Sequence, residues 1–142
     1  MFKKGNFTGV LILVILIGLS VILAIIVILT RVDEAVPEPT VLFVSSSEAR
    51  EKINEHQGAF ILDVRTIGEF VASRIPESVN IPYDTIAANQ DLLPENKHTP
   101  IFVYCRTGRR AGVAASDLTE LGYTKIIVFP GMIDWEYETV SG

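Results

Sequence analysis

An almost uninterrupted apolar run from Val10 to Leu29 constrains this chain more than any other feature of its sequence. Val, Ile and Leu make up nearly all of it, and the exceptions are Gly18, Ser20 and Ala24. As a helix, which rises about 1.5 Å per residue, the run spans roughly 30 Å, the thickness of the hydrocarbon core of a bilayer. In lipid, a single segment can satisfy its backbone hydrogen bonds only as a helix. The run therefore predicts one transmembrane helix over residues 9–30, after a short tail formed by residues 1–8.

A cleaved signal peptide and a buried helix of a globular domain both fit the apolar run less well. A signal peptide has an apolar region of about 7–15 residues that ends in small residues, whereas this run is longer and no A-x-A site closes it. A buried helix would need a polar face toward solvent, and this segment has none. An uncleaved anchor is the interpretation that the sequence favours.

The charges on either side of the run predict its orientation. Lys3 and Lys4 precede it, whereas the residues just after it are mostly acidic: Arg31 stands among Asp33, Glu34 and Glu38. Positive charges flanking a span remain on the cytoplasmic side. We therefore expect a single-pass protein of the cell membrane, with a cytoplasmic N-terminus and an extracytoplasmic domain.

The composition changes after the apolar run. Residues 31–40 contain two prolines, which favour an extended linker, and the predicted globular domain occupies residues 41–142. Beyond residue 30 the chain carries 10 basic and 17 acidic residues, a net charge of −7. Nucleic acid is bound through basic surfaces, so we expect no nucleic-acid partner.

The sequence contains one cysteine and two histidines. A single cysteine cannot form an internal disulfide, and the chain has no CxxC or zinc-finger spacing. His56 and His98 lie in polar stretches without metal-ligand spacing, as ordinary surface histidines do. We expect neither a metal site nor a cofactor.

From Val41 onward, short apolar runs alternate with helix-forming stretches. Strands are predicted over residues 41–44, 60–64, 101–104 and 126–129, and the third of these is apolar enough to be central and buried on both faces. Strands that alternate with helices predict an α/β fold in which helices cover both faces of a mainly parallel sheet.

Capping boxes mark two of the predicted helix starts. Ser45 and Thr66 are each followed three residues later by a glutamate, so that side chain and backbone can cap each other. The first helix is expected to run to about His56, and a later one to end at Leu121 before Gly122. The residues expected to face the sheet are Phe70, Val71, Val113, Leu118 and Leu121.

Cys105 stands between the third predicted strand and a helix, in the loop Cys105-Arg106-Thr107-Gly108-Arg109-Arg110. Ligands of parallel sheets bind at the carboxyl ends of strands, where this loop falls. Its backbone N–H groups and the helix dipole would converge on an anion, and its arginines add full positive charges. Such surroundings favour a thiolate over a thiol. We expect Cys105 to be ionised and accessible, with Gly108 at a positive φ.

Three groups of residues resemble the single-domain rhodanese family, the thiosulfate sulfurtransferase-like proteins. The first is Leu62-Asp63-Val64-Arg65-Thr66 with Glu69-Phe70, followed by Ile75-Pro76 and Val79-Asn80-Ile81-Pro82. The second is the stretch from Val103 to Ala111 around Cys105. The third is Ala114-Ala115, Leu118 and Leu121-Gly122-Tyr123, then Gly131-Met132 and Trp135. The resemblance covers residues 41–135 and departs from the family's usual pattern at Ser73-Arg74, Glu77 and Pro130. Glycine is common in the family at the position of Glu77.

The resemblance implies a rhodanese-like three-layer fold and sulfur transfer through a persulfide on Cys105. It implies that a small sulfur-containing anion is the donor and that a thiol or another thiophilic group is the acceptor, with no cofactor. The donor-binding residues would be Arg106, Thr107, Gly108, Arg109 and Arg110. Asp63 and Arg65 would support the fold through an ion pair or loop hydrogen bonds, and Trp135 would lie in the core.

Several alternatives remain open. Cys105 could be a buried structural thiol, as free cysteines often are. A cysteine phosphatase is disfavoured because its C-x5-R loop needs an arginine where this chain has Ala111. Arsenate reduction by a rhodanese-like protein, and a non-catalytic domain that binds a partner or carries sulfur, are both compatible with the loop.

Overall fold

The structure is a computed structural model that describes residues 7–30 and 38–142. The predicted tail lies largely outside the described residues, and so does most of the predicted linker, at residues 31–37. The chain divides into two compact units, Met1–Val36 and Pro37–Gly142, and each is described by itself.

The described residues of the first unit form one helix, α1 (Phe7–Thr30). It begins two residues before the predicted start of the apolar segment and ends where that segment was expected to end. Its stretch Gly9–Val27 is long and apolar enough to cross a membrane, and its side chains are exposed within the unit.

The second unit is built on a five-stranded sheet in which every neighbouring pair of strands is parallel. Its strands are β1 (Thr40–Phe43), β2 (Phe60–Asp63), β3 (Val79–Asn80), β4 (Ile101–Cys105) and β5 (Lys125–Gly131). The order across the sheet is β1-β5-β4-β2-β3. All five residues of the central strand β4 are buried, as its apolar sequence predicted. Four of the strands confirm predicted ones, and β3 is an additional two-residue strand.

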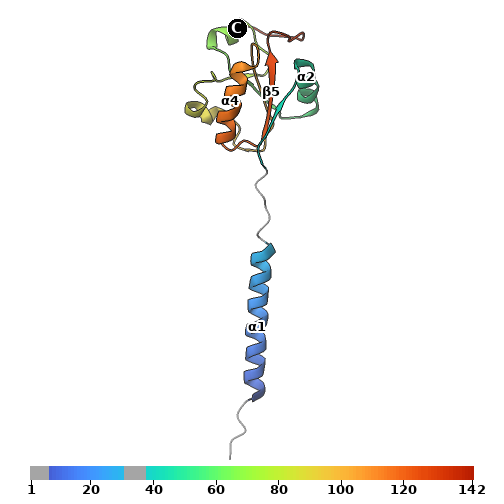
Figure 1. The fold of residues 1–142 in the computed structure, drawn as a ribbon, viewed down its shortest axis with the longest axis vertical. Coiled ribbons are helices and arrows are strands. Elements are labelled where there is room, and N and C mark those ends of the chain that lie inside the picture. Colours follow the sequence, from blue (N-terminus) through green and yellow to red (C-terminus); the bar gives the residue numbers. More distant parts are fainter. Residues whose placement is uncertain (1–6, 31–37) are drawn as a thin grey trace, which may run out of the picture. The chain divides into compact units, whose positions relative to one another are not determined.

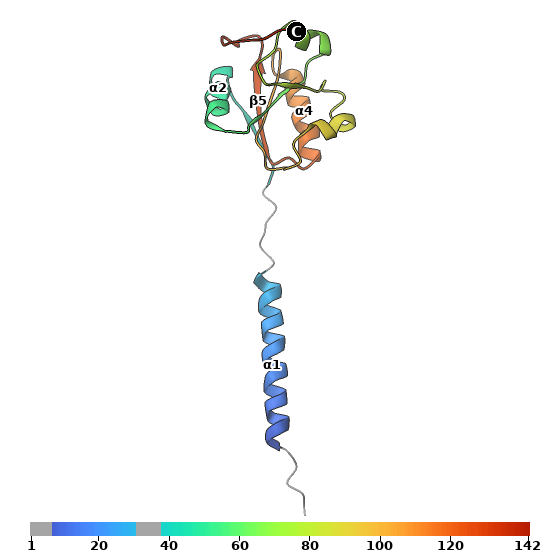
Figure 2. The same cartoon turned by 180° about the vertical axis from the view of Figure 1, so that it is seen from behind.

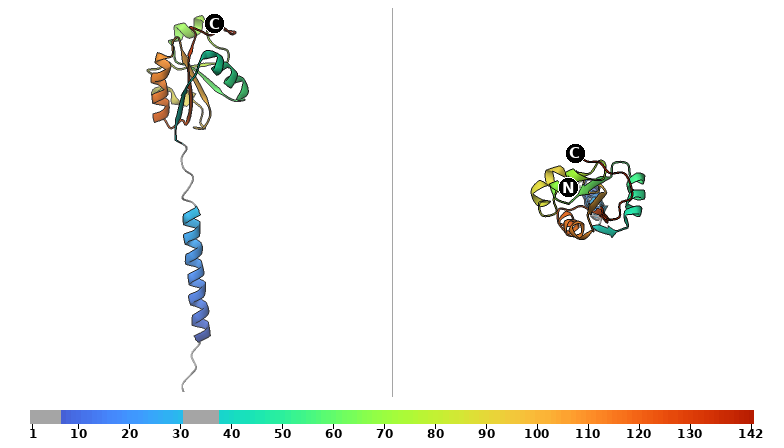
Figure 3. Two further views of the ribbon diagram at one scale, coloured as in Figure 1. Left: turned by 45° about the vertical axis from the view of Figure 1, so that its right-hand side comes forward. Right: turned by 90° about the horizontal axis from the view of Figure 1, so that it is seen from above.

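The helices cover both faces of the sheet. They are α2 (Ser46–Glu55), α3 (Ile67–Ala72) and α4 (Arg109–Glu120), with the 3-10 helix η1 (Ala87–Leu92). In Figures 1 and 2, α2 and α4 lie on opposite sides of β5. The left-hand view of Figure 3 shows the same arrangement of helix, sheet and helix. The predicted α/β fold with three layers is confirmed.

Both predicted capping boxes are present. The Ser45 hydroxyl accepts a hydrogen bond from the Glu48 N–H, and the Glu48 carboxylate accepts one from the Ser45 N–H. Thr66 and Glu69 cap α3 in the same reciprocal way. These bonds satisfy backbone donors that the first turn of a helix otherwise leaves unpaired.

A separate apolar core lies on each side of the sheet. One contains Ala111, Ala114, Ala115 and Leu118 of α4, and the other contains Ala49 of α2 with Phe129 and Trp135. Trp135 is buried, as predicted. Two expectations about inward-facing residues were wrong, because Val71 and Val113 are exposed. In α4 the small side chains of the alanines make the contact with the sheet, so the apolar stripe is displaced from Val113.

Glu77 has a φ of +64°, the one positive φ among the described residues that are not glycine. A left-handed conformation costs an L-residue about 1–2 kcal/mol, whereas glycine adopts it freely but loses about 0.5–1 kcal/mol of chain entropy. We expect Glu77→Gly to raise the free energy of unfolding by about 0.5–1 kcal/mol. The measurement is chemical denaturation followed by the fluorescence of Trp135, the only tryptophan in the sequence. Glu77→Ala is the control, because it keeps the Cβ atom and should give no gain; equal stabilisation by both variants would contradict the role of the backbone conformation.

Candidate active site

Cys105 is the last residue of β4, and the loop after it leads directly into α4. Gly108 is the N-cap of this helix and has a φ of +89°, the left-handed conformation that the sequence predicted. This turn of the backbone points the Gly108 N–H back toward the strand, where it donates a hydrogen bond to Cys105 Sγ at 3.1 Å. The positive end of α4 is therefore directed at the sulfur, which stabilises negative charge on it.

The thiol is more enclosed than the sequence led us to expect. Cys105 is 1 % exposed, so the prediction of an accessible side chain was wrong. Cys105 belongs to the apolar core on the α4 side of the sheet, and the Gly108 N–H bonds its Sγ from the loop. A donor must therefore displace part of this loop, or pass between its residues, to reach the sulfur.

A second glycine, Gly131, allows the end of β5 to approach the loop closely. Its φ is +82°, and a Cβ atom placed on it would lie 2.6 Å from the Cys105 carbonyl oxygen and 2.6 Å from Tyr104 Cδ2. The pairing between β4 and β5 is irregular at this point, with Cys105 opposite Gly131. No residue with a side chain fits here without moving the backbone beside the nucleophile.

The turn after Gly131 holds the first part of the loop. The N–H of Met132 donates to the Cys105 carbonyl oxygen at 3.2 Å, and the N–H of Ile133 donates to the Arg106 carbonyl oxygen at 3.1 Å. These two bonds hold the start of the loop against the end of β5.

Arg110 forms an ion pair with Glu69, a pairing that the sequence did not predict. Its two terminal nitrogens donate to the two carboxylate oxygens of Glu69, at 2.7 and 2.8 Å. Hydrogen bonding to Arg110 lowers the pKa of Glu69 to about 2. Glu69 raises the pKa of Arg110, and the nearby Cys105 raises it further. Arg110 thus lies within electrostatic reach of the sulfur while its guanidinium is held by α3.

The Glu69–Arg110 pair predicts a pH dependence of stability. Because the folded-state pKa of Glu69 is about 2 and its ordinary value is 4.5, the pair contributes stability above about pH 4.5 and loses it as the pH falls toward 2. We expect the difference in unfolding free energy between the wild type and Glu69→Gln to shrink across this window. Denaturation curves at neutral pH and at several acidic values measure it. If this difference in unfolding free energy did not change with pH, the lowered pKa of Glu69 would be contradicted.

The remaining side chains of the loop point outward. Arg106, Thr107 and Arg109 are exposed. Within residues 38–142, neither Arg106 nor Arg109 forms an ion pair. Two guanidinium groups that lack carboxylate partners are free to bind an oxyanion.

Asp63 and Arg65 form a buried ion pair at the end of the neighbouring strand β2. Arg65 Nε donates to both carboxylate oxygens of Asp63 at 3.0 Å, and its Nη2 donates to the Ser73 carbonyl oxygen at 2.6 Å. Asn80 donates to the carbonyl oxygens of both residues. The Val64 N–H donates to the Tyr104 carbonyl oxygen, so this network is attached to the residue before Cys105. It positions the end of β4 without contacting the sulfur.

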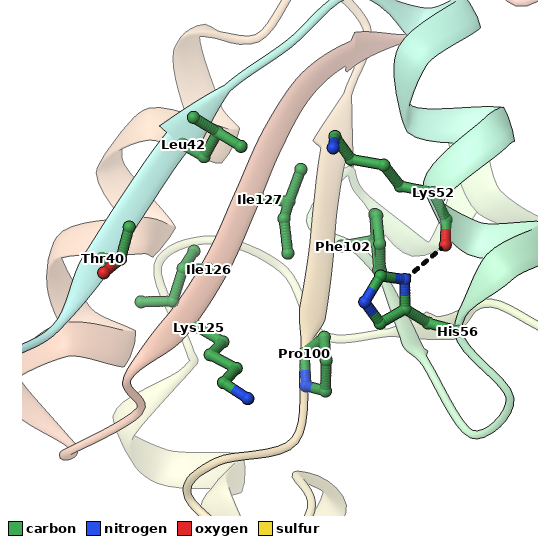
Figure 4. Close-up of a pocket in the computed structure, with 9 residues that line it drawn as sticks. All are labelled: Thr40, Leu42, Lys52, His56, Pro100, Phe102, Lys125, Ile126 and Ile127. Carbon is green, nitrogen blue, oxygen red and sulfur yellow. Dashed lines mark hydrogen bonds between the residues drawn. The ribbon is translucent and has the colours of Figure 1, made fainter. Parts of the chain in front are cut away.

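Cys105 does not line either of two pockets near the sheet. One, of about 290 Å³, lies at the end where β4 begins, and Figure 4 shows Lys52, His56 and Lys125 around an apolar floor that includes Phe102 and Ile127. Cys105 is at the other end of the same strand. The second, of about 410 Å³, lies between the β1–α2 connection and the loop, where Thr107 and Gly108 line it. Neither is lined by Cys105.

Sequence reasoning missed two features of the site. Glu69 was identified only as a helix cap and as part of the resemblance, although an acidic residue that follows one strand and an arginine that follows its neighbour are natural partners at one sheet edge. The close approach of Gly131 to Cys105 has no sequence signal apart from the glycine itself.

Comparisons with known proteins agree on one family. The model of the rhodanese-like domain family matches residues 45–136. The putative sulfur carrier protein YrkF of Bacillus subtilis is 35 % identical over 97 residues, which are 68 % of this chain and 51 % of that protein. The matching region therefore spans about half the length of that relative. Thiosulfate sulfurtransferase PspE of Escherichia coli is 28 % identical over 81 residues, 57 % of this chain and 78 % of that protein.

Solved structures agree with the sequence matches. The crystal structure of a rhodanese-like domain protein from Staphylococcus aureus superposes with a TM-score of 0.63 at 27 % identity, and the match covers 71 % of this chain and 98 % of that one. The resemblance predicted from the three groups of residues is confirmed. This chain belongs to the rhodanese-like domain family of sulfurtransferases and sulfur carriers.

Proposed function

We propose that this chain is a membrane-anchored sulfurtransferase that moves a sulfane sulfur from a donor such as thiosulfate to a thiophilic acceptor through a persulfide on Cys105. The observation that carries the proposal is the Gly108 N–H directed at Cys105 Sγ from the start of α4. A backbone donor, a helix dipole and nearby arginines together stabilise an anionic sulfur, both as the thiolate and as the persulfide.

In the first half-reaction the Cys105 thiolate attacks the outer sulfur of thiosulfate. A sulfur–sulfur bond forms to Sγ, and the bond between the outer sulfur and the sulfonate sulfur breaks. The electron pair of the broken bond leaves with sulfite, so the charges balance without a general base. In the second half-reaction the acceptor attacks the terminal sulfur of the persulfide, and Cys105 is released as a thiolate.

The arginines of the loop have different tasks in this scheme. Arg106 and Arg109 are exposed and without ion pairs among the described residues, so they bind the oxyanion end of the donor. Arg110 is held by Glu69 and acts as a fixed positive charge near the sulfur. Because Cys105 is enclosed, the loop must open for the donor and for the acceptor.

The names of the relatives support this proposal and one alternative. PspE is named a thiosulfate sulfurtransferase, which favours thiosulfate as the donor. YrkF is named a putative sulfur carrier protein, which favours a chain that forms the persulfide and delivers it without turnover on small molecules. Both functions use the same persulfide and differ in the acceptor.

Steady-state kinetics test the proposal. With thiosulfate and cyanide both varied, the full chain in detergent should produce thiocyanate with parallel double-reciprocal lines, because sulfite leaves before cyanide reacts. Intersecting lines would contradict a covalent intermediate. A loaded persulfide that no cyanide discharges would favour the carrier, and the absence of any persulfide would contradict both.

We also propose that Gly9–Val27 anchors the chain in the cell membrane, with the rhodanese-like domain outside the cytoplasm. The support is the length and composition of α1 and the position of Lys3 and Lys4. Alkaline extraction of membranes should leave the full-length chain in the pellet, and protease added to spheroplasts should degrade the domain. A shortened chain in the soluble fraction would instead identify the segment as a cleaved signal sequence.

A further inference from the structure

A pocket of about 290 Å³ lies at the end of the sheet where the strands begin, whereas Cys105 is at the opposite end of β4. We use the name α2 pocket for it. Its floor is the sheet from β1 across β5 to β4, and its wall is formed by Lys52, in the last turn of α2, and by His56, the C-cap of that helix (Figure 4). The sulfur transfer proposed above does not involve this pocket.

The strand register arranges the floor of the α2 pocket in two rows. Leu42 of β1 and Phe102 of β4 are both paired with Ile127 of β5, so these three apolar side chains lie side by side across the sheet. Two residues earlier on the same strands, and therefore on the same face, Thr40 is paired with Lys125. The hydrogen bonds of the sheet thus hold an apolar row beside a lysine.

The apolar row is open to a ligand at two of its three positions. Leu42 is 44 % exposed and Ile127 is partly exposed, whereas Phe102 is buried beneath the pocket. Strand β1 is the edge of the sheet, and α2 covers the face nearer to β4 (Figure 4). A ligand on this row would therefore remove apolar surface from water without moving any strand or helix.

The wall of the α2 pocket presents positive charge although it is the carboxyl end of a helix. Figure 4 shows the Lys52 side chain extending from α2 toward the floor. The Lys52 carbonyl oxygen accepts a hydrogen bond from the His56 backbone N–H at 3.1 Å and forms another with His56 Nδ1 at 2.8 Å. These bonds satisfy a carbonyl group at the negative end of the helix dipole, which would otherwise disfavour an anion.

The charge of the α2 pocket is opposite to that of the domain around it. Residues 38–142 contain nine basic and fifteen acidic residues, whereas the lining of the pocket includes two lysines and no acidic residue. Within residues 38–142, neither Lys52 nor Lys125 forms an ion pair. Glu48 of α2 is held by hydrogen bonds to Ser45 and lines the other pocket. The remaining acidic residues close to the lining in sequence are exposed and do not line the α2 pocket: Glu38, Glu51 and Glu55.

This combination of floor and wall narrows the class of ligand. A cation would be repelled by both lysines, and an inorganic anion would leave the apolar row uncovered. An extended polyanion would meet the acidic residues outside the pocket. The volume of about 290 Å³ is at the small end of the range for small-molecule sites. The ligand that uses every part of the lining is small, apolar along its body and negatively charged.

We propose that the α2 pocket binds a small organic carboxylate with an apolar body. The body lies on the row formed by Leu42, Ile127 and Phe102, and the carboxylate accepts charge-assisted hydrogen bonds from the lysine ammonium groups of the lining. This site goes beyond the proposed sulfur transfer, because it uses neither Cys105 nor the loop that follows it.

A titration of the isotope-labelled full chain in detergent tests this proposal by nuclear magnetic resonance. The probes are naphthaleneacetate, its neutral analogue naphthaleneacetamide and its cationic analogue naphthaleneethylamine, and detergent without protein corrects for partition into micelles. We expect naphthaleneacetate to shift the amide signals of Thr40, Lys125 and Ile127 with a Kd on the order of 1 mM. The neutral analogue should bind roughly two- to fivefold more weakly, and the amine should give no saturable shift.

Lysine variants test the charge of the lining. Lys52→Gln and Lys125→Gln should each weaken the binding of naphthaleneacetate by roughly two- to fivefold, the range for one exposed ion pair. Lys97→Gln is the matched control, because the Lys97 ammonium lies 3.9 Å from the centroid of the Tyr123 ring and does not line the pocket. An equal effect of all three variants would overturn the pocket as the binding site.

A serine variant tests the apolar row. Leu42→Ser should weaken binding by roughly three- to tenfold, since it removes an exposed apolar side chain that the ligand would cover. Leu92→Ser is the control, because Leu92 is 50 % exposed on η1 and does not line the pocket. Each variant must first show the signal dispersion of the wild type, so that weaker binding cannot come from unfolding.

The remaining outcomes separate this site from the sulfur chemistry. Cys105→Ser should bind naphthaleneacetate as tightly as the wild type, and Lys52→Gln should still form the persulfide with thiosulfate. Loss of binding in Cys105→Ser would contradict a separate site. The absence of a saturable shift up to about 10 mM naphthaleneacetate, roughly ten times the expected Kd, or equal binding of the three probes, would overturn the proposal and leave the sulfur transfer untouched.

Discussion

Replacing Cys105 with serine is expected to lower thiosulfate:cyanide sulfurtransferase activity by a factor on the order of 10³ or more, to the rate of the uncatalysed mixture. The serine hydroxyl is a far weaker nucleophile than a thiolate, and the electropositive loop cannot ionise it near neutral pH. Cys105 is also the only cysteine in the sequence, so no other thiol can take over. The measurement is thiocyanate production at saturating thiosulfate and cyanide.

The control for this variant must exclude a folding defect, because residue 105 is buried. The Cys105→Ser and Cys105→Ala variants should both unfold cooperatively, with Trp135 fluorescence that resembles that of the wild type. Residual activity above one tenth of the wild-type rate in either folded variant would place the chemistry elsewhere and contradict the role of Cys105.

Arg65→Met is expected to have the largest effect on stability, a loss of about 3–5 kcal/mol in the free energy of unfolding. Asp63 is fully buried and Arg65 is 5 % exposed, so the variant leaves a carboxylate without its counter-ion in the interior. The same change removes the donor to the Ser73 carbonyl oxygen. Methionine keeps much of the volume of the arginine stem, so the loss arises from charge and hydrogen bonding rather than from a cavity.

A double-mutant cycle isolates the ion pair. The combination of Asp63→Asn with Arg65→Met removes both charges, and it should be less destabilised than the sum of the two single variants. Denaturation curves followed by Trp135 fluorescence give the four free energies. Additive losses would show that the two side chains contribute independently, which contradicts their hydrogen-bonded geometry.

Local sequence patterns predicted most of the fold. The capping boxes at Ser45 and Thr66 fixed two helix starts because a side chain three residues from its partner leaves few alternatives. The fully apolar run at residues 101–104 identified the central strand, since only a strand covered on both faces can bury every side chain. The orientation of α4 was predicted only in part, because Leu118 packs against the sheet as expected but three alanines replace Val113 in that contact.

The site was predictable in composition but not in shape. The order of strand, loop and helix placed Cys105 at the positive end of α4, and the need for a left-handed residue identified Gly108. The enclosure of Cys105 depends on how it packs into the apolar core beside α4, and the ion pair of Arg110 with Glu69 joins two segments 41 residues apart in sequence. Such features arise from tertiary contacts that no local pattern encodes.

The most direct test of the central claim follows the sulfur atom itself. The full chain is treated with thiosulfate that carries a heavy isotope in its outer sulfur. After digestion, mass spectrometry measures the mass of the peptide that contains Cys105. The account predicts a mass gain of one labelled sulfur atom on Cys105, which disappears when cyanide is added and reappears as labelled thiocyanate. A Cys105 peptide of unchanged mass, with label absent from thiocyanate, would contradict it.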